Sequence, residues 1–114
     1  MSEQRPAILD ACAAQLAASR SQPFGPEVDV FKVVGKVFAL VSTRAGDGQL
    51  TVKCDPAVSE ALRAEHPAIT PGYHMNKRHW ITVALDGSVP LAVLRELIED
   101  SHLLVRPRNL EARP

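Results

Sequence analysis

The residues with the clearest chemical potential form one run, Asn76-Lys77-Arg78-His79-Trp80. The run combines two cations, two side chains that both donate and accept hydrogen bonds, and one large aromatic ring. Cations and hydrogen-bond donors bind phosphate oxygens, and aromatic rings stack on bases. The run therefore indicates a contact with nucleic acid. The alternative is an exposed hairpin tip in which Trp80 only anchors a sheet.

Four further basic side chains lie on segments that we expect to be strands or turns: Lys32, Lys36, Arg44 and Lys53. The expected helices carry mainly Glu and Asp. The chain has 13 basic and 13 acidic side chains and no net charge, so a basic sheet edge would face away from an acidic helical side. This segregation of charge favours weak, salt-dependent binding of DNA.

Other reactive residues fit catalysis or metal binding poorly. Asp100-Ser101-His102 are adjacent on an expected helix, so their side chains diverge and cannot form a hydrogen-bonded triad. Cys54 has only Lys53 beside it to activate its thiol. His74 and His79 flank a turn, but a zinc site needs three or four converging ligands. Without a phosphate-binding glycine loop, we expect no enzyme, no metal and no cofactor.

Length and composition fit a single domain over residues 1–114. The chain has 114 residues, 46% of them apolar, which suffices for one core without metal or disulfide crosslinks. Cys12 and Cys54 stand far apart without a CxxC pair, which indicates reduced thiols. The N-terminal segment does not look like a signal peptide, and no window is apolar enough to cross a membrane. We therefore expect a cytoplasmic protein.

The hydrophobic pattern predicts the elements that position these residues. Apolar residues at helical spacing indicate helices over Pro6–Ser19, over Pro56–Glu65 and from Pro90 to near Pro107. Alternating or β-branched stretches indicate strands over Val28–Val33, Lys36–Ser42, Gln49–Lys53, Tyr73–Met75 and His79–Leu85. The last two strands form a hairpin around Asn76-Lys77-Arg78. The segment Ser19–Pro26 is interpreted as a break.

The residues between the first two strands do not suit a two-residue turn. Val34 should resist the positive φ angle of a two-residue primed turn. We therefore expect a longer loop, with Gly35 in the left-handed conformation.

Short loops between strands require antiparallel pairing, and three helices cover one face of a five-stranded sheet. The expected fold is an α+β two-layer sandwich with the order α-β(3)-α-β(2)-α. The first two strands are apolar on both faces, which does not suit a face exposed to water. Either the first helix wraps onto the second face or a partner subunit covers it, as in a homodimer.

The segment Pro71–Gly87, with Asn76 to Trp80 at its centre, resembles the signature stretch of the MmcQ/YjbR family of small bacterial proteins. Further likenesses follow in the family's order at Pro23-Phe24-Gly25, Leu50–Pro56 and Glu96–Ser101, so the resemblance covers about residues 8–106. It implies the α-β(3)-α-β(2)-α fold, which is similar to CyaY/frataxin-like and secretion-chaperone-like domains. It also implies a DNA-binding label that rests largely on fold analogy.

Two functions from different classes follow. In the first, a cytoplasmic domain binds DNA weakly through its basic strand-hairpin surface and does no chemistry of its own. In the second, a protein-interaction or chaperone-like module uses the apolar second face of the sheet. Binding that weakens steeply with salt supports the first function, whereas a salt-insensitive dimer supports the second.

Overall fold

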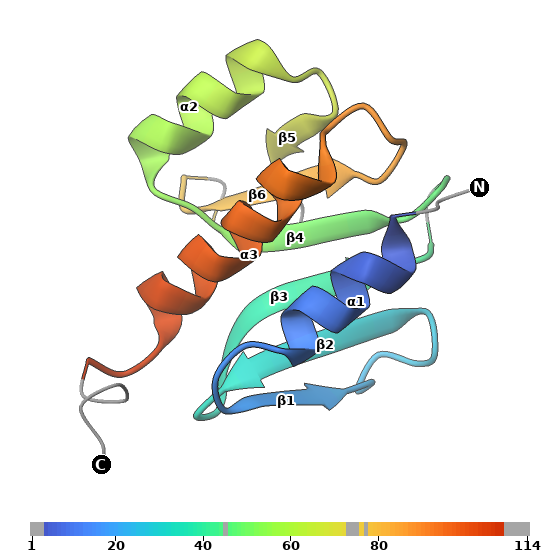
Figure 1. Cartoon of the computed structure of the whole chain (residues 1–114), viewed down its shortest axis with the longest axis vertical. Coiled ribbons are helices and arrows are strands. Elements are labelled where there is room, and N and C mark those ends of the chain that lie inside the picture. The colour runs from blue at the N-terminus through green and yellow to red at the C-terminus, as the bar shows by residue number, and fades with distance from the viewer. Residues whose placement is uncertain (1–3, 45, 73–75, 77, 109–114) are drawn as a thin grey trace.

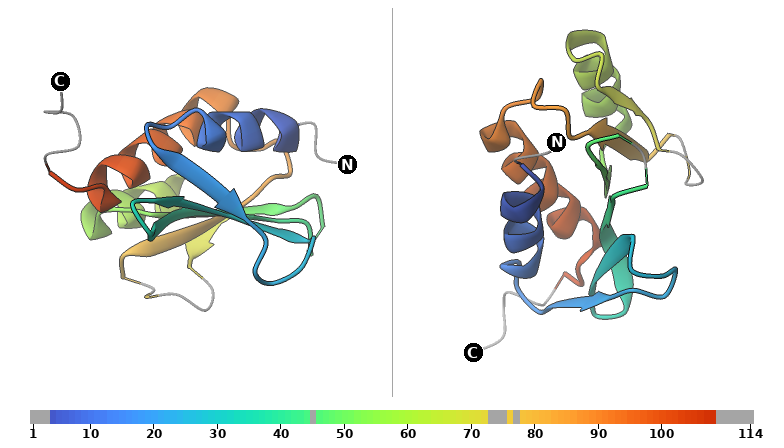
Figure 2. Two further views of the ribbon diagram at one scale, coloured as in Figure 1. Left: turned by 90° about the horizontal axis from the view of Figure 1, so that it is seen from below. Right: turned by 90° about the vertical axis from the view of Figure 1, so that its right-hand side faces the viewer.

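The computed structural model describes residues 4–44, 46–72, 76 and 78–108. These residues form the helices α1 (Arg5–Ala13), α2 (Pro56–Glu65) and α3 (Leu91–Val105). The strands are β1 (Ala18–Ser21), β2 (Val28–Val33), β3 (Lys36–Ser42), β4 (Gln49–Lys53), β5 (Ile69–Pro71) and β6 (Trp80–Ala84). They make one antiparallel sheet in the order β1-β2-β3-β4-β6-β5. Helices α1 and α3 lie side by side on one face, and α2 packs near β5 (Figures 1 and 2).

The expected α+β class is confirmed, and β2, β3, β4 and α2 have the predicted bounds. The sheet, however, has six strands and not five. The additional strand β1 lies partly in the segment predicted as a break, and it pairs antiparallel with β2 from Ala18↔Val33 to Ser21↔Val30. Three of its four residues are exposed. An edge strand held by main-chain hydrogen bonds needs no apolar alternation, so the hydrophobic pattern missed it.

Helix α1 ends at Ala13 and not at the predicted Ser19. The apolar spacing continues to Leu16, but Leu16 is exposed. Ala17 has a φ angle of 58°, which turns the chain into β1. His102 on α3 donates a hydrogen bond to the Leu16 carbonyl oxygen at 2.8 Å. A contact distant in the sequence therefore stabilises the point where the chain leaves the helix.

The partner of β6 also differs from the prediction. The expected strand Tyr73–Met75 lies outside the described residues. Instead, β5 (Ile69–Pro71) pairs with β6, although this segment was predicted as a loop. Proline is tolerated on an edge strand, where its missing N–H faces no neighbouring strand. The proline signal was therefore misleading, and the connection from β5 to β6 runs from Gly72 to His79.

Strands β2 and β3 are joined by the two-residue turn Val34-Gly35, so the prediction of a longer loop was wrong. Val33 pairs directly with Lys36, and the φ angles are 48° at Val34 and 80° at Gly35. The left-handed conformation expected for Gly35 is confirmed. At Val34 it costs about 1–2 kcal/mol, and the β2–β3 pairing outweighs this cost.

The core lies between the helices and the sheet. Helices α1 and α3 contribute Ile8, Cys12, Leu94, Leu97 and Ile98, and the strands contribute alternate residues that include Phe31, Val33, Val41, Leu50, Val52, Ile81 and Val83. On each strand, the residues that alternate with these core residues point to the opposite side of the sheet. We call that side the open face, because neither α1 nor α3 covers it (Figure 2).

The apolar residues on the open face have a different cover from the one expected. The explanation that the first helix wraps onto this face was wrong, because α1 packs beside α3 on the other face. Val28 and Val30 are nevertheless buried within one chain. The loop between β1 and β2 projects on the open side of the sheet (Figure 2). Coverage by a partner subunit stays a prediction. None of the helices described is long and apolar enough to span a membrane.

Candidate nucleic-acid interface

One end of the sheet collects most of the residues proposed from the sequence. Because the strands are antiparallel, the start of β3, the end of β4 and the start of β6 share this end. Lys36, Lys53 and Trp80 occupy these three positions, and Lys53 pairs directly with Trp80. Lys32 lies near the end of β2, and Arg78 lies just before β6. We call Lys32, Lys36, Lys53 and Arg78 the basic end.

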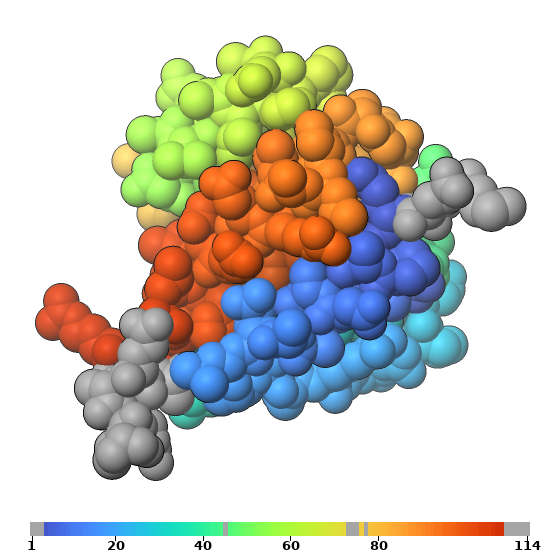
Figure 3. Space-filling view, viewed as in Figure 1, coloured from blue at the N-terminus to red at the C-terminus, as the bar shows by residue number. Residues whose placement is uncertain are grey.

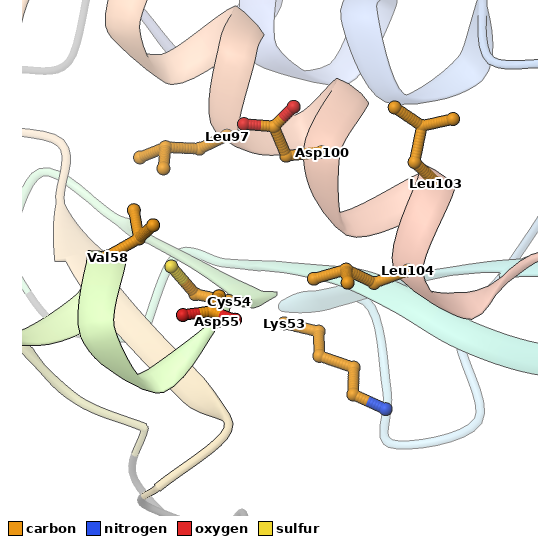
Figure 4. Close-up of a pocket in the computed structure, with 8 residues that line it drawn as sticks. All are labelled: Lys53, Cys54, Asp55, Val58, Leu97, Asp100, Leu103 and Leu104. Carbon is orange, nitrogen blue, oxygen red and sulfur yellow. The ribbon is translucent and has the colours of Figure 1, made fainter.

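Lys32, Lys53 and Trp80 point to the open face. Their neighbours along the strands, such as Val33, Val52 and Ile81, belong to the core, and side chains alternate between the two faces of a sheet. All three are partly exposed. Figure 4 shows the Lys53 side chain extending away from α3. Two lysines and the tryptophan ring are therefore presented on one surface.

The charges of the elements are segregated as the sequence predicted. The three helices carry six carboxylates and three arginines, whereas the six strands carry four basic residues and one carboxylate, Asp29. Figure 3 views the helical side, where α3 lies between α1 and α2. Asp29 is buried on that side, so the strand residues of the open face include no carboxylate. A phosphate on this face would meet no strand carboxylate.

Asp29 is neutralised by its own surroundings. Arg20 Nε donates to Asp29 Oδ1 at 2.8 Å, Gln22 Nε2 donates to the same oxygen at 2.9 Å, and Arg5 lies 3.8 Å from Oδ2. Burial raises the pKa of Asp29, but the hydrogen bonds from Arg20 and Gln22 and the charges of Arg20 and Arg5 outweigh burial and hold this pKa below its usual value. Arg20 also lies over the Phe31 ring. These residues stabilise the fold and do not belong to the basic end.

Arg44 is separated from the other proposed residues. It follows β3, at the opposite end of that strand from Lys36. Its guanidinium donates to the Phe24 carbonyl oxygen at 2.9 Å and lies 3.9 Å from Glu27 Oε1. The structure therefore does not bring Arg44 together with the basic end.

Asn76 shapes the loop before β6. Its carbonyl oxygen accepts hydrogen bonds from the amides of His79 and Trp80, both at 3.0 Å. Its side-chain Oδ1 accepts from the Arg78 amide, also at 3.0 Å, which is a typical use of asparagine in turns. This side chain holds the turn that leaves Arg78 exposed. Lys77 lies outside the described residues.

The loop is tied to the sheet on both sides of Trp80. The His79 carbonyl oxygen accepts from the Cys54 amide at 2.7 Å, and the Trp80 carbonyl oxygen accepts from the Gly72 amide at 2.8 Å. A Cβ atom at Gly72 would lie 2.7 Å from the Cβ of Trp80, which is closer than such atoms approach. Glycine is therefore required at position 72 for the chain to pass this close to Trp80.

Ser101 is a positioning residue that the sequence analysis did not assign. The β2–β3 register shifts near Phe38, and the β3–β4 register ends at Ala39↔Val52. Beyond that pair, the buried Ser101 hydroxyl donates to the Phe38 carbonyl oxygen at 2.6 Å and accepts from the Lys53 amide at 2.9 Å. It thereby joins the ends of β3 and β4 beneath Lys53. The sequence analysis considered it only as part of the rejected triad Asp100-Ser101-His102 and as part of the family-like segment of α3.

Two arginines after α3 also escaped the sequence analysis. Ser101 places the last turns of α3 against β3 and β4 at the basic end, and Arg106 and Arg108 follow directly. Arg108 is exposed and Arg106 is half-buried. Basic residues directly after a helix were the available signal. They extend the positive charge of this end beyond the strands.

A groove of about 250 Å³ lies on the helical side of the same end (Figure 4). It is lined by Lys53, Cys54, Asp55, Val58, Leu97, Asp100, Leu103 and Leu104. Burial and then the nearby carboxylates of Asp55 and Asp100 raise the pKa of the Cys54 thiol. The neutral thiol is therefore a poor nucleophile. In the part of the chain that the structure describes, no three His, Cys, Asp or Glu side chains are grouped to hold a metal, and His74 lies outside that part.

These features define a small α+β domain with a basic end that carries a tryptophan on the open face of the sheet. The family model described as YjbR matches residues 14–104. The chain therefore belongs to the YjbR family, which confirms the resemblance found in the sequence.

Similar proteins agree with this assignment. The chain is 49% identical over 83 residues to the uncharacterized protein YbdF of Escherichia coli O157:H7, with 73% of this chain and 68% of YbdF covered. It is 33% identical over 95 residues to the uncharacterized protein YjbR of Escherichia coli K12, with 83% and 80% covered. A crystal structure of a Deinococcus radiodurans protein matches with a TM-score of 0.78 and 41% identity, over 85% of this chain and 74% of that one. These relatives support the family and the fold.

Proposed function

We propose that this protein is a cytoplasmic DNA-binding protein that binds weakly through its basic end and catalyses no reaction. The observation that carries the proposal is the gathering of Lys32, Lys36, Lys53 and Arg78 at one end of the sheet, beside Trp80. The strand residues of the open face add no carboxylate that would repel a phosphate. The carboxylates of this end, Asp55 and Asp100, line the groove on the helical side.

The number of cations sets the expected salt dependence. If each of the four cations neutralises one phosphate of duplex DNA, log affinity should fall with log salt with a slope of about −3.6. Between 50 and 200 mM salt, this slope corresponds to a loss of affinity of about 150-fold. Binding of this kind is weak at physiological salt and carries little sequence preference.

The test is fluorescence anisotropy with a labelled 20-base-pair duplex at a series of salt concentrations. The double variant Lys32→Gln with Lys53→Gln should weaken binding at low salt and flatten the slope by about 1.8. The charge-matched control, Arg44→Gln with Arg95→Gln, removes two exposed charges away from the basic end and should leave most of the binding intact. Equal losses in both double variants would show non-specific attraction and contradict the proposed site.

The alternative function, a protein-interaction or chaperone-like module, has one observation in its favour. Val37 and Leu40 on β3 are only half-buried, and they extend the apolar surface of the open face toward Trp80. Val28 and Val30 are already buried within the chain, which leaves less apolar area for a partner. Sedimentation at micromolar concentration should show a salt-insensitive dimer of twice the 12.4 kDa chain if this alternative is correct.

A further inference from the structure

A transverse row of side chains crosses the open face at the basic end. The register pairs Lys32 on β2 with Val37 on β3, and Lys53 on β4 with Trp80 on β6. Between these two pairs, the β3–β4 register ends at Ala39↔Val52 and Ser101 bridges the two strands beyond it, so the row consists of two paired halves at the same end of the sheet. It presents two cations on one side of an aromatic ring.

The shape of this surface does not suit the grooves of duplex DNA. The major groove admits an α-helix or a two-stranded ribbon that protrudes from a protein. Helices α2 and α3 each carry more carboxylates than arginines and α1 carries one of each, so none offers a cationic face. Trp80 belongs to β6, which lies between β4 and β5 within the sheet. A ring in that position can reach a base only if the base is unpaired and turned outward.

Hydroxyl groups lie beside the row on the same face. The Oγ1 atoms of Thr51 on β4 and Thr82 on β6 are 3.0 Å apart, and the exposed Thr70 lies next to Thr82 on β5. Thr82 is buried, so the half-buried Thr51 and the exposed Thr70 supply the accessible hydroxyls, each of which can both donate and accept hydrogen bonds. The surroundings of the tryptophan are therefore cationic and polar. This combination suits a phosphate backbone with bases laid flat against the sheet.

We infer that the nucleic acid bound by this protein is single-stranded, that one base stacks on Trp80, and that Lys53 and Lys32 contact the phosphates beside it. This inference rests on the proposed function and specifies the form of its ligand. The strand lies across β6, β4, β3 and β2 along the transverse row. Stacking is tolerant of base identity because every base has an aromatic face, so the site selects unpaired bases and not a sequence.

Trp80 is the single tryptophan of the chain, so intrinsic fluorescence reports directly on the site. The probes are a 12-nucleotide oligo(dT) strand and a 12-base-pair duplex, titrated at equal salt. Oligo(dT) should quench the Trp80 emission and bind more tightly than the duplex. Labelled probes and anisotropy then compare variants that lack the tryptophan.

The variants separate stacking from charge. Trp80→Leu should weaken oligo(dT) binding by about 5- to 150-fold, because stacking contributes about 1–3 kcal/mol per base. Trp80→Phe keeps an aromatic ring and should retain most of the affinity. The control Phe24→Leu removes an exposed aromatic ring from the β1–β2 loop and should change nothing. Circular dichroism and thermal melting show whether each variant is folded. If Trp80→Leu is unfolded, the comparison of Trp80→Phe with the wild-type protein still tests the inference.

The outcomes for this inference and for the proposed function differ. The inference would be overturned if the protein bound oligo(dT) and the duplex with equal affinity and without a change in Trp80 emission. The proposed function would still stand if the Lys32→Gln/Lys53→Gln variant lost binding to both probes. Absence of binding to either probe at low salt would overturn both. Quenching of Trp80 by oligo(dT) supports both if the Lys32→Gln/Lys53→Gln and Trp80→Leu variants weaken oligo(dT) binding and the Phe24→Leu control does not.

Discussion

The Ser101→Ala substitution should destabilise this protein far more than the loss of an ordinary surface hydroxyl. The Ser101 side chain is fully buried. Its oxygen donates at 2.6 Å to the Phe38 carbonyl and accepts at 2.9 Å from the Lys53 amide. Both main-chain groups lie beyond the last β3–β4 pair, Ala39↔Val52. Alanine would remove the partner of both groups together.

The expected cost follows from these two groups. A buried main-chain group left without a partner costs about 1–3 kcal/mol. Because both groups lie at the end of the sheet, where water can partly replace the hydroxyl, we expect a loss of about 2–4 kcal/mol in the free energy of unfolding. For a domain of this size, each kcal/mol lowers Tm by about 4 °C. The variant should therefore melt about 8–16 °C below the wild-type protein.

The assay is urea unfolding followed by circular dichroism, together with thermal melting. The control Ser19→Ala removes an exposed hydroxyl whose single hydrogen bond is long, at 3.5 Å, and it should change stability by less than about 0.5 kcal/mol. Amide hydrogen exchange should also become faster at Lys53 in the Ser101→Ala variant. If the free energy of unfolding of Ser101→Ala lies within about 0.5 kcal/mol of the wild-type value, the Ser101 bridge between β3 and β4 does not stabilise the fold.

Three further predictions address the charges and the loop. The pKa of Asp29 is lowered in the folded state, so the stabilisation by its carboxylate is complete above about pH 5 and is lost as the pH falls through the folded-state pKa. Urea unfolding between pH 2.5 and 7 should therefore show that the free energy of unfolding falls less steeply with decreasing pH in Asp29→Asn than in the wild-type protein. The double variant Lys77→Ala with Arg78→Ala should flatten the salt slope for duplex DNA by about 0.9 per lost contact, at a cost of only about 0.5 kcal/mol in stability; an unchanged slope and affinity would remove this loop from the interface. Gly72→Ala should lower the stability of the fold by about 1–3 kcal/mol, because the alanine Cβ would lie 2.7 Å from the Cβ of Trp80. Thermal melting measures this loss, and an unchanged Tm would show that the loop shifts to accommodate the added methyl group without cost.

The sequence by itself determined the elements whose signals are local. Strands β2, β3 and β4 have the predicted bounds because their apolar residues are dense and regularly placed. Helix α2 begins where predicted because Asp55 accepts a hydrogen bond from the Ala57 amide and Pro56 suits the first helical position. The charge segregation was also predictable, since it depends only on which residues lie in helices and which in strands.

Only the tertiary structure decided the edges of the sheet and the composition of the basic end. Strands β1 and β5 are held by main-chain pairing with β2 and β6, and such pairing leaves no pattern in the side chains of an edge strand. Strand direction placed Lys36 and Lys53 at one end and Arg44 at the other. The bridge made by Ser101 connects residues far apart in the sequence. Periodicity and spacing describe near neighbours along the chain, whereas these features depend on contacts that exist only after the strands and α3 have packed together.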